Sequence, residues 1–508
     1  MQQDHRLVRG TPYSLELPHE GETPIELFAT PEVPLETSAV DELLAFAELE
    51  SSVRSLASDV PEFFGDREPV INRIAVTPDF HKGAGIPIGT VLQTEGFVVP
   101  QAIGNDINCG MRLMTTPLER SDVDPEMDRV EAKTREGFFE GRRQLPMTPG
   151  QREAMVRRGL PGLLDHAGEA GGEGLWGKFD ADKEREALDH VHAGGGFETD
   201  GVFALEDYLA QGRKLSYDNL IGGLGGGNHF AELQYVKEIH DGAIAHAWGL
   251  KRDQVVLMIH CGSLGLGHVT GRWFQDQIRR VYPEQRAHPS NGIYPLPIDG
   301  PHAGLFEAFM ISMRNAANFA FGNRFFLAQM LRESLAQAIG PFPMDTLYDA
   351  PHNLLWEAGD GTFIHRKGAS PAHGFEAMDD TPFLTTGEPV IVPGSMGASS
   401  WILAGRGCDG AISSSCHGAG RALSRNDAAK VDDAQLDAFL EEFRVVTPVD
   451  PQREDIKRQG KIIEAWREAL KKEAPFAYKS ITPVIETLRA AGMAEPVAEL
   501  HPLMTVKG

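Results

Sequence analysis

Two glycine-flanked motifs, rich in residue types that bind metals and phosphates, lie far apart in the 508-residue chain. Residues 104–110 read Gly-Asn-Asp-Ile-Asn-Cys-Gly, and residues 415–421 read Ser-Cys-His-Gly-Ala-Gly-Arg. Further candidate site residues are scattered from Asp106 to Lys507, with neither an internal repeat nor a compositional break typical of a linker between them. This pattern predicts a single interwoven domain over residues 1–508, with its site assembled from distant loops.

The first motif places the carboxylate of Asp106 three residues before the thiol of Cys109. A thiolate can bridge two metal ions, and a neighbouring carboxylate favours a borderline-hard divalent ion such as manganese or zinc. The second motif places the imidazole of His417 in a glycine-rich turn ending at Arg421, where free backbone N–H groups and a guanidinium can hold phosphate. A metal cluster beside a phosphate cradle that contains a histidine is typical of nucleotidyl transfer.

Three of the eighteen histidines stand where a β-like or glycine-rich run ends, namely His229, His260 and His352. Loops at the ends of such elements are where functional sites are commonly built. Together with Asp106 and Cys109 they provide a carboxylate, a thiolate and three imidazoles. These groups can give two metals a tetrahedral-like shell each if the thiolate bridges them.

The composition excludes several classes of protein. A formal net charge of −25 argues against coating nucleic acid through a broad basic face, although a polyanion can still occupy a local cationic pocket. A hydrophobic content of 41% indicates a globular protein, and four cysteines are too few for a secreted disulfide scaffold of this size. Neither a signal peptide nor an apolar run of bilayer-spanning length is visible. We therefore expect a cytoplasmic protein without a membrane partner.

Residue patterns also predict the main elements. Apolar periodicity predicts helices at 40–56, 307–338, 433–443 and 453–473, the second being the longest. Short β segments are expected at 74–116, 254–259 and 388–425, and a glycine-rich loop at 222–227. Residues 120–215 look charged, glycine-interrupted and irregular.

An ordered series of motifs gives the chain a family resemblance. The matching segments lie at 78–83, 104–110, 225–232, 259–263, 265–268, 317–320, 352–353, 365–369, 393–397, 415–425 and 507–508. In this order they resemble the RtcB family of RNA ligases, from about residue 74 to the last residue, with residues 1–70 as a divergent N-terminal segment. The resemblance implies an α+β fold: one large interwoven domain with mixed β-sheets, flanking helices and a deep metal-containing cleft.

The resemblance also implies an activity. Members of the family join an RNA 3′-phosphate or 2′,3′-cyclic phosphate end to a 5′-hydroxyl end with GTP and manganese. The expected cofactors are therefore GTP and two Mn²⁺, other divalent ions remaining open. The expected partners are RNA with such ends and an archease-like activator.

The same resemblance assigns roles to individual residues. Asp106, Cys109, His229, His260 and His352 match the two-manganese ligands, and His417 matches the histidine that becomes covalently linked to GMP. The expected guanylate pocket comprises Asn228, Phe230, Glu232, Ser395, Ser400, Gly418, Ala419, Gly420, Tyr478 and Lys507. Glu232 suits guanine because a carboxylate accepts from the N1 and N2 donors that adenine lacks. Lys367 and Arg421 are expected near phosphate, whereas His81, His268 and His365 are expected to be structural or to support the ligands.

One position departs from the family pattern. Leu264 follows His260-Cys261-Gly262-Ser263 where the family usually has an arginine, and leucine offers no donor for an RNA phosphate. Lys82, Arg272 and Lys367 are the candidate replacements for this cation. Two alternatives to the ligase therefore stay open. One is a divergent paralogue that transfers guanylate to a different phosphorylated acceptor, and the other is a non-catalytic metal-dependent protein that binds RNA ends or nucleotides.

Overall fold

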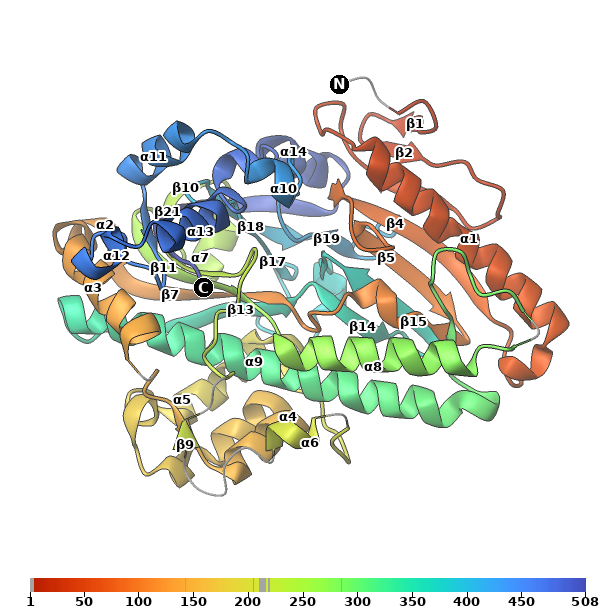
Figure 1. Cartoon of the computed structure of the whole chain (residues 1–508), viewed down its shortest axis with the longest axis horizontal. Helices are drawn as coiled ribbons and strands as arrows, with labels where there is room; N and C mark the ends of the chain where they lie inside the picture. The colour runs from red at the N-terminus through yellow and green to blue at the C-terminus, as the bar shows by residue number, and fades with distance from the viewer. Residues whose placement is uncertain (1–3, 142, 204, 210–215, 218–219, 285) are drawn as a thin grey trace.

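Two large β-sheets form the centre of the fold (Figure 1). The computed structural model describes residues 4–141, 143–203, 205–209, 216–217, 220–284 and 286–508. The first sheet has seven strands, in the order β1 (Val8–Thr11), β2 (Ser14–Glu16), β3 (Ile25–Phe28), β4 (Val70–His81), β5 (Ile88–Glu95), β15 (Thr362–Lys367) and β14 (Asn353–Glu357). The β3–β4 pair is parallel and the other neighbours are antiparallel, so this sheet is mixed.

The second sheet has eight strands and is also mixed, because it contains one parallel pair. Its order is β13 (Asp345–Pro351), β7 (Gly110–Glu119), β11 (Gln254–Cys261), β10 (Phe230–Ile239), β21 (Ala494–Val506), β18 (Ser400–Gly405) and β17 (Pro389–Val392), with β20 (Arg444–Val446) parallel to β21. The last strand of the chain, β21, therefore lies in the middle of this sheet, beside β10. This pairing brings the C-terminal Lys507 close to residues 227–229.

The chain leaves one large sheet at His352 and again at Gly368. His352 is the single residue between β13, in the second sheet, and β14, in the first. Gly368 separates β15 from the short β16 (Ala369–Pro371), which pairs with β19 (Ser414–Cys416), directly before His417. Two further two-stranded pairs join β6 (Phe97–Val98) to β12 (Leu296–Pro297) and β8 (Pro146–Met147) to β9 (Ser216–Tyr217).

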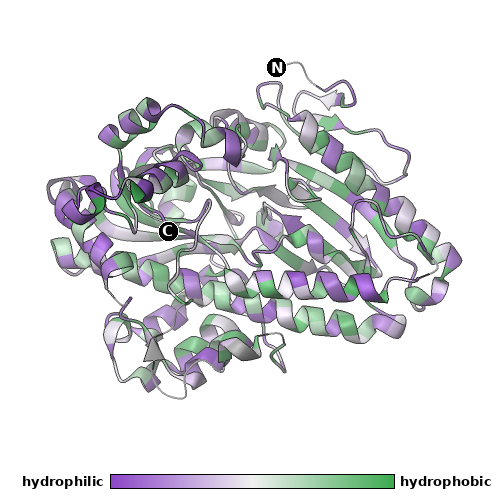
Figure 2. Cartoon of the chain, in the orientation of Figure 1, coloured by the Kyte–Doolittle hydropathy of each residue, from purple (hydrophilic) through white to green (hydrophobic). Residues whose placement is uncertain are grey.

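Helix α9 (Ala303–Ile339) packs against both halves of the molecule. Its N-terminal part, including Phe309 and Met313, belongs to the apolar core of the first sheet, with Phe46 of α1 (Thr37–Asp59). Its later part, including Phe325, belongs to the core of the second sheet. The helix is buried along most of its 37 residues, and its apolar segments alternate with hydrophilic ones (Figure 2).

Shorter helices flank the sheets. They are α2 (Arg120–Val123), α3 (Met127–Arg135), α4 (Pro149–Asp165), α5 (Ala181–Glu186), α6 (Glu206–Leu209), α7 (Gly242–Ala247), α8 (Gly265–Val281), α10 (Arg425–Ala428), α11 (Asp433–Glu442), α12 (Glu454–Lys457), α13 (Gly460–Lys471) and α14 (Thr482–Ala490). Helix α8 runs beside α9 (Figure 1). Among the described residues, no helix combines the length and apolar character needed to cross a bilayer.

The predicted α+β fold with mixed sheets and flanking helices is confirmed, and the predicted helices at 40–56, 307–338 and 433–443 correspond to α1, α9 and α11. The predicted helix at 453–473 is instead two helices, α12 and α13, because the chain breaks at Gln459, which has non-helical φ and ψ of −101° and 75°. The region 120–215 is less irregular than expected, since it contains α4, although this helix is broken at Gly159, where φ and ψ are 64° and −143°. That residues 1–508 form one domain stays a prediction.

A candidate two-metal centre in a nucleotide-sized cleft

The loop that carries Asp106 and Cys109 lies between a 3-10 turn at Pro100–Ile103 and β7. Its backbone is fixed from several sides. The Cys109 N–H donates to the Asp106 carbonyl over 3.0 Å, and Asn108 N–H donates to the Asn353 carbonyl over 2.7 Å. The Asp106 carboxylate in turn accepts a 3.0 Å hydrogen bond from the backbone N–H of Leu264. These contacts hold a carboxylate and a thiol at one end of the second sheet.

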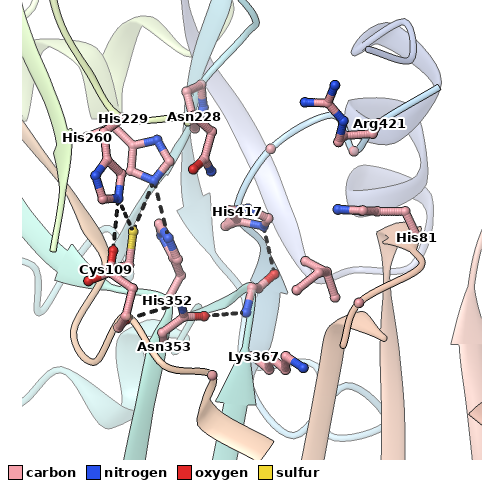
Figure 3. A pocket seen from close by; sticks show the side chains of 18 of the residues that line it. His81, Cys109, Asn228, His229, His260, His352, Asn353, Lys367, His417 and Arg421 are labelled. Atoms are coloured by element: carbon pink, nitrogen blue, oxygen red, sulfur yellow. Dashed lines mark hydrogen bonds and ion pairs between the residues drawn. The ribbon is translucent and has the colours of Figure 1, made fainter. Parts of the chain in front are cut away.

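The candidate ligands from four different segments converge on Cys109 (Figure 3). Its Sγ lies 3.3 Å from Nε2 of His229, which precedes β10, and 3.4 Å from Nε2 of His260, in β11. His352, between the sheets, has its Nε2 3.3 Å from Nε2 of His260. On the other side, His229 Nε2 lies 2.9 Å from Asp106 Oδ2. Two groups result, Asp106–Cys109–His229 and Cys109–His260–His352, and each can hold a metal ion.

The pKa values of these buried groups are shifted in different directions. Burial lowers the pKa of His229, but the neighbouring Cys261 and Cys109 and the contact with Asp106 raise it well above the ordinary value. Burial and the charge of Asp106 raise the pKa of the Cys109 thiol to about 12. Burial and the neighbouring imidazoles hold the pKa values of His260 and His352 well below the ordinary value, so both rings are neutral with lone pairs to donate. A thiolate in this place needs a positive charge beside it, and thiolate and imidazole ligands suit zinc or a transition-metal ion better than a hard cation such as calcium.

His417 faces this cluster from the opposite wall (Figure 3). Its ring centre lies 4.6 Å from that of His352. The Nδ1–H donates to the Gly368 carbonyl over 2.9 Å and lies 2.5 Å from a carboxylate oxygen of the fully buried Asp79. Burial alone would lower the pKa of His417, but the Asp79 charge and these contacts raise it above the ordinary value. The other ring nitrogen, Nε2, has no hydrogen bond to any residue that the structure describes.

The cluster and His417 line one cleft with a volume of 690 Å³, within the usual range for sites that bind small molecules. The cleft extends from the metal cluster across the turn at 418–421 toward the segment around Tyr478 and the C-terminal Lys507. Eight of the ten residues expected to contact guanylate line it: Asn228, Phe230, Ser395, Gly418, Ala419, Gly420, Tyr478 and Lys507.

Comparison with known proteins places this site in a family. The family model described as tRNA-splicing ligase RtcB matches residues 66–508. The tRNA-splicing ligase RtcB of Thermococcus kodakarensis is 33% identical over 464 residues, which cover 85% of this chain and 87% of that protein. The RNA-splicing ligase RtcB of Mycobacterium bovis is 32% identical over 464 residues, covering 85% and 96%.

The chain belongs to the RtcB family. RNA-splicing ligase RtcB homolog 1 of Entamoeba dispar is a further relative, 30% identical over 457 residues that cover 85% of this chain and 78% of the relative. The resemblance seen in the sequence motifs is thereby confirmed, and the family match begins slightly earlier than expected, at residue 66.

In this RtcB chain, the two remaining guanylate candidates do not line the cleft. Glu232 is 1% exposed in β10, and its carboxylate accepts hydrogen bonds from the Thr505 hydroxyl and from the Gln234 amide, the latter over 2.5 Å. Burial raises the pKa of Glu232 to about 7. Ser400 is also 1% exposed, and its side chain does not line the cleft. Its hydroxyl oxygen accepts a hydrogen bond from the Gly394 N–H over 3.0 Å. The role of Glu232 as guanine reader stays a prediction.

The two cations expected near phosphate both line the RtcB cleft, and both already have protein partners. Lys367 donates to the Ile86 carbonyl over 2.7 Å, and burial lowers its pKa to about 8. Arg421 donates to the Lys472 carbonyl over 2.6 Å, and its guanidinium lies over the Tyr478 ring, 5.0 Å from the centroid. Each side chain still has N–H donors beyond these contacts, because an ammonium has three and a guanidinium five.

Leu264 stands immediately before α8, with a φ of 52° that is unusual for a leucine. Its side chain turns away from the cleft and packs over the glycine loop: a Cβ added to Gly225 would lie 2.7 Å from the Leu264 Cδ2. The position thus supports the loop that precedes His229, in addition to giving its N–H to Asp106. Residue 264 therefore contributes no side-chain hydrogen-bond donor to the cleft.

Sequence reasoning missed two acidic residues in the RtcB cleft region. Asp79, which contacts His417, lies in the matching segment 78–83, from which the sequence alone predicts no role for it. Glu473, 6% exposed, lines the cleft and accepts a hydrogen bond from the Tyr478 hydroxyl, while Arg421 lies 3.5 Å away. Of the histidines expected to be structural, His365 is one, since its Nε2 accepts from the Val99 N–H over 2.8 Å, whereas His268 is exposed at the cleft.

Proposed function

We propose that this protein is a GTP-dependent RNA ligase that joins RNA 3′-phosphate or 2′,3′-cyclic phosphate ends to 5′-hydroxyl ends through a covalent histidine–GMP intermediate on His417. The observation that carries the proposal is the placement of His417. It is held through Nδ1 alone, with Nε2 free, in the same cleft as two candidate metal groups that share Cys109.

The first step uses the free nitrogen of His417. Its Nε2 lone pair attacks the α-phosphorus of GTP, a P–N bond forms, and the bond to the β-phosphate oxygen breaks with release of pyrophosphate. Asp79 and the Gly368 carbonyl keep the remaining ring proton on Nδ1, which fixes the tautomer and stabilises the positive ring as the bond forms. Two Mn²⁺, held by Asp106, Cys109, His229, His260 and His352, would neutralise phosphate charge when bound.

Two further transfers complete the reaction. An oxygen of the RNA 3′-phosphate attacks the same phosphorus, so that the P–N bond breaks and His417 is released. The 5′-hydroxyl then loses its proton and attacks the terminal RNA phosphorus, expelling GMP and leaving a phosphodiester. A 2′,3′-cyclic end must first be opened by water to a 3′-phosphate, because the second step needs a free phosphate oxygen.

The cleft wall beyond His417 supports a nucleotide as substrate. Lys507 donates to the carbonyls of Gly227 and His229, over 2.5 and 2.7 Å, and burial lowers its pKa to about 8. This residue, Asn228, Phe230, Ser395 and the turn at 418–420 are proposed to surround the guanylate, with Tyr478 and Glu473 at its far end. We further propose a cytoplasmic protein whose partners are RNA and an archease-like activator.

The test is incubation with α-labelled GTP and manganese, followed by denaturing electrophoresis and then by addition of RNA ends. The chain should become labelled with GTP in preference to ATP and should pass the label to 3′-phosphate RNA. His417→Ala should take no label, whereas His268→Ala, which alters an exposed cleft histidine, should label normally. Label that persists in His417→Ala would contradict the proposed nucleophile.

Leu264 favours one second candidate, a paralogue that transfers guanylate to a different phosphorylated acceptor. If an arginine fork at this position normally binds an RNA phosphate, the wild-type chain should form enzyme–GMP normally but ligate slowly. Leu264→Arg should then raise single-turnover transfer to RNA about tenfold or more without changing labelling. Wild-type transfer as fast as labelling would exclude this second candidate.

A further inference from the structure

Helix α8 carries a stripe of exposed polar side chains, two of them arginines without a partner in the described part of the chain, that continues the wall of the cleft. His268 and Gln275 line the cleft, and Arg272 and Arg279 share their helical face because the four residues are spaced by three or four positions. All four are exposed. At 1.5 Å per residue the stripe extends about 16 Å along the helix.

The arginines of α8 have no acidic partner among the described residues, although the chain is strongly acidic. Arg272, Arg279 and the neighbouring Arg280 form neither ion pairs nor hydrogen bonds within the part of the chain that the structure describes. By contrast, Arg157 and Arg158 of α4 each lie within 2.9 Å of a carboxylate oxygen, of Glu153 and Asp165. The helix itself contains one acidic residue, Asp276. A cluster of free guanidinium groups in a protein with a net charge of −25 favours an anionic ligand at this place.

An aromatic side chain lies next to the cationic stripe. Trp273 is 37% exposed and is held by edge contacts with Phe203 and Phe274, whose ring centres lie 5.0 and 4.7 Å from its own. Val269, one turn earlier, is 53% exposed. Guanidinium groups that track a phosphate backbone beside a fixed aromatic ring on which bases stack are the combination that binds single-stranded nucleic acid without sequence preference.

Helix α8 is also packed directly on the loop that carries the candidate metal ligands. A Cβ added at Gly267 would lie 2.7 Å from the Asn105 carbonyl oxygen, and one added at Gly271 would lie 2.8 Å from the Asn105 amide oxygen. The stripe therefore begins beside Asp106 and leads away from it over the outer surface, where α8 is drawn with hydrophilic segments along its length (Figure 2).

We propose that the outer face of α8, from His268 to Arg280, binds the single-stranded RNA that leads to the reacting end, with Arg272 and Arg279 on its phosphates and Trp273 stacked on a base. The inference rests on the proposed RNA ligase function and adds a binding surface outside the cleft. The arginines of this surface would supply cations to the RNA in a chain that has no cation at position 264.

The test measures binding of single-stranded 3′-phosphate RNAs of about 4 and about 20 nucleotides by fluorescence anisotropy over a series of salt concentrations. Replacing both arginines, Arg272→Ala with Arg279→Ala, should weaken binding of the long RNA about tenfold or more and reduce the slope of log K against log salt by about 1.4, or 0.7 per lost phosphate contact. Binding of the short RNA should not change. Trp273→Ala should weaken the long RNA about fivefold or more without changing the salt slope.

Two control variants separate this surface from general charge effects. Lys251→Ala with Arg252→Ala removes two exposed cations that also lack acidic partners among the described residues but do not line the cleft, and it should leave binding unchanged. Arg272→Lys with Arg279→Lys should retain the salt slope. Unchanged thermal unfolding will show that the α8 variants are folded.

The inference is overturned if the double arginine variant binds the long RNA as tightly as the wild type, if the control variant loses as much, or if the short RNA loses equally. Labelling by GTP and joining of short RNA ends report separately on the proposed function. If the wild-type chain does neither, the proposed function fails whatever the α8 variants do. If it does both and the α8 variants bind long RNA normally, the inference alone fails.

Discussion

At the scale of single residues, the site depends on which ring nitrogen of each histidine is engaged. His417 is held through Nδ1 by Asp79 and the Gly368 carbonyl, whereas His229, His260 and His352 direct Nε2 toward one another or toward Cys109. The contacts of Nδ1 leave Nε2 as the ring nitrogen of His417 without a hydrogen bond to any described residue. The three converging Nε2 atoms leave lone pairs that a cation can satisfy.

Asp79→Asn tests the positioning of His417. The amide keeps the size of the side chain but removes the charge that stabilises the Nδ1–H tautomer and the positive ring, so the rate of GMP labelling should fall about a hundredfold or more. Rapid-quench labelling with α-labelled GTP measures the rate. Thr77→Val, which removes a 2.7 Å hydrogen bond to Asp79 but keeps its charge, should have a much smaller effect. Equal rates in Asp79→Asn and wild type would contradict the assigned role.

Cys109→Ala tests the shared thiolate. Because Cys109 belongs to both candidate metal groups, its loss should remove manganese from both positions, whereas His352→Ala should weaken mainly one. Elemental analysis of metal per chain distinguishes the two outcomes. The matched control is Cys408→Ala, which alters a half-buried thiol outside the two groups. Unchanged manganese in Cys109→Ala would show that the thiolate does not bridge.

The residues that could be predicted from the sequence are those with scarce chemistry. A thiol, a carboxylate and imidazoles at the ends of strands have few purposes together, so the sequence singles out five candidate ligands. The structure places these five residues in one cluster, and their role as ligands stays a prediction. Asp79 was not given a role because an aspartate after a proline most often belongs to a turn. Glu232 was placed in the pocket from the motif, yet its exposure depends on the β10–β21 pairing with Thr505, which no local pattern reveals.

At the scale of elements, α9 contacts the loop that carries Asp106 and Cys109 through one buried arginine. Arg324 is completely buried and donates to the Asp349 carboxylate over 2.7 Å. It also donates to the Asn108 carbonyl over 2.6 Å and to the Cys261 carbonyl over 3.1 Å. One helix thus joins the loop of Cys109 to the strand of His260.

Arg324→Met should therefore destabilise both the fold and the site. It leaves Asp349 with Arg112 as its one cationic partner among the described residues and leaves buried carbonyls without donors, so we expect a loss of about 3–5 kcal/mol in the free energy of unfolding. Urea titration measures the loss, and weaker manganese binding should accompany it. Arg314→Met removes an exposed pair with Glu357 on the same helix and should cost less than about 1 kcal/mol. Equal losses in the two variants would contradict the supporting role of Arg324.

Prediction of elements was best where apolar periodicity was long and uninterrupted. The sequence predicts helix α9 within a few residues of its ends, because its apolar periodicity can be recognised without knowing what packs against it. Helix α8 was not predicted, since Gly265, Gly267 and Gly271 indicate a loop by propensity. At Gly267 a Cβ would lie 2.7 Å from the Asn105 carbonyl oxygen, so tertiary packing rather than local preference explains this glycine.

At the scale of the whole molecule, the candidate metal centre lies where the two large sheets meet. Asp106 and Cys109 precede β7, while His229 and His260 lie at β10 and β11, all in the second sheet. His352 forms the passage from the second sheet to the first, and His417 approaches on the β16–β19 pair. A cation bound here therefore joins segments that are distant in the sequence, and its binding energy contributes to the stability of the whole arrangement.

Removal of metal should accordingly lower global stability. Manganese at about 100 times its Kd should raise the free energy of unfolding by about 2.7 kcal/mol for each occupied site, relative to chelator-treated protein, because the unfolded chain cannot assemble the ligands. Differential scanning calorimetry should show a higher Tm with manganese and a smaller rise with magnesium, which binds thiolate and imidazole poorly. Cys109→Ala should lose the manganese-dependent rise, while His268→Ala, at the cleft but outside both metal groups, should keep it. A rise that persists in Cys109→Ala would place the stabilising ion elsewhere in the molecule.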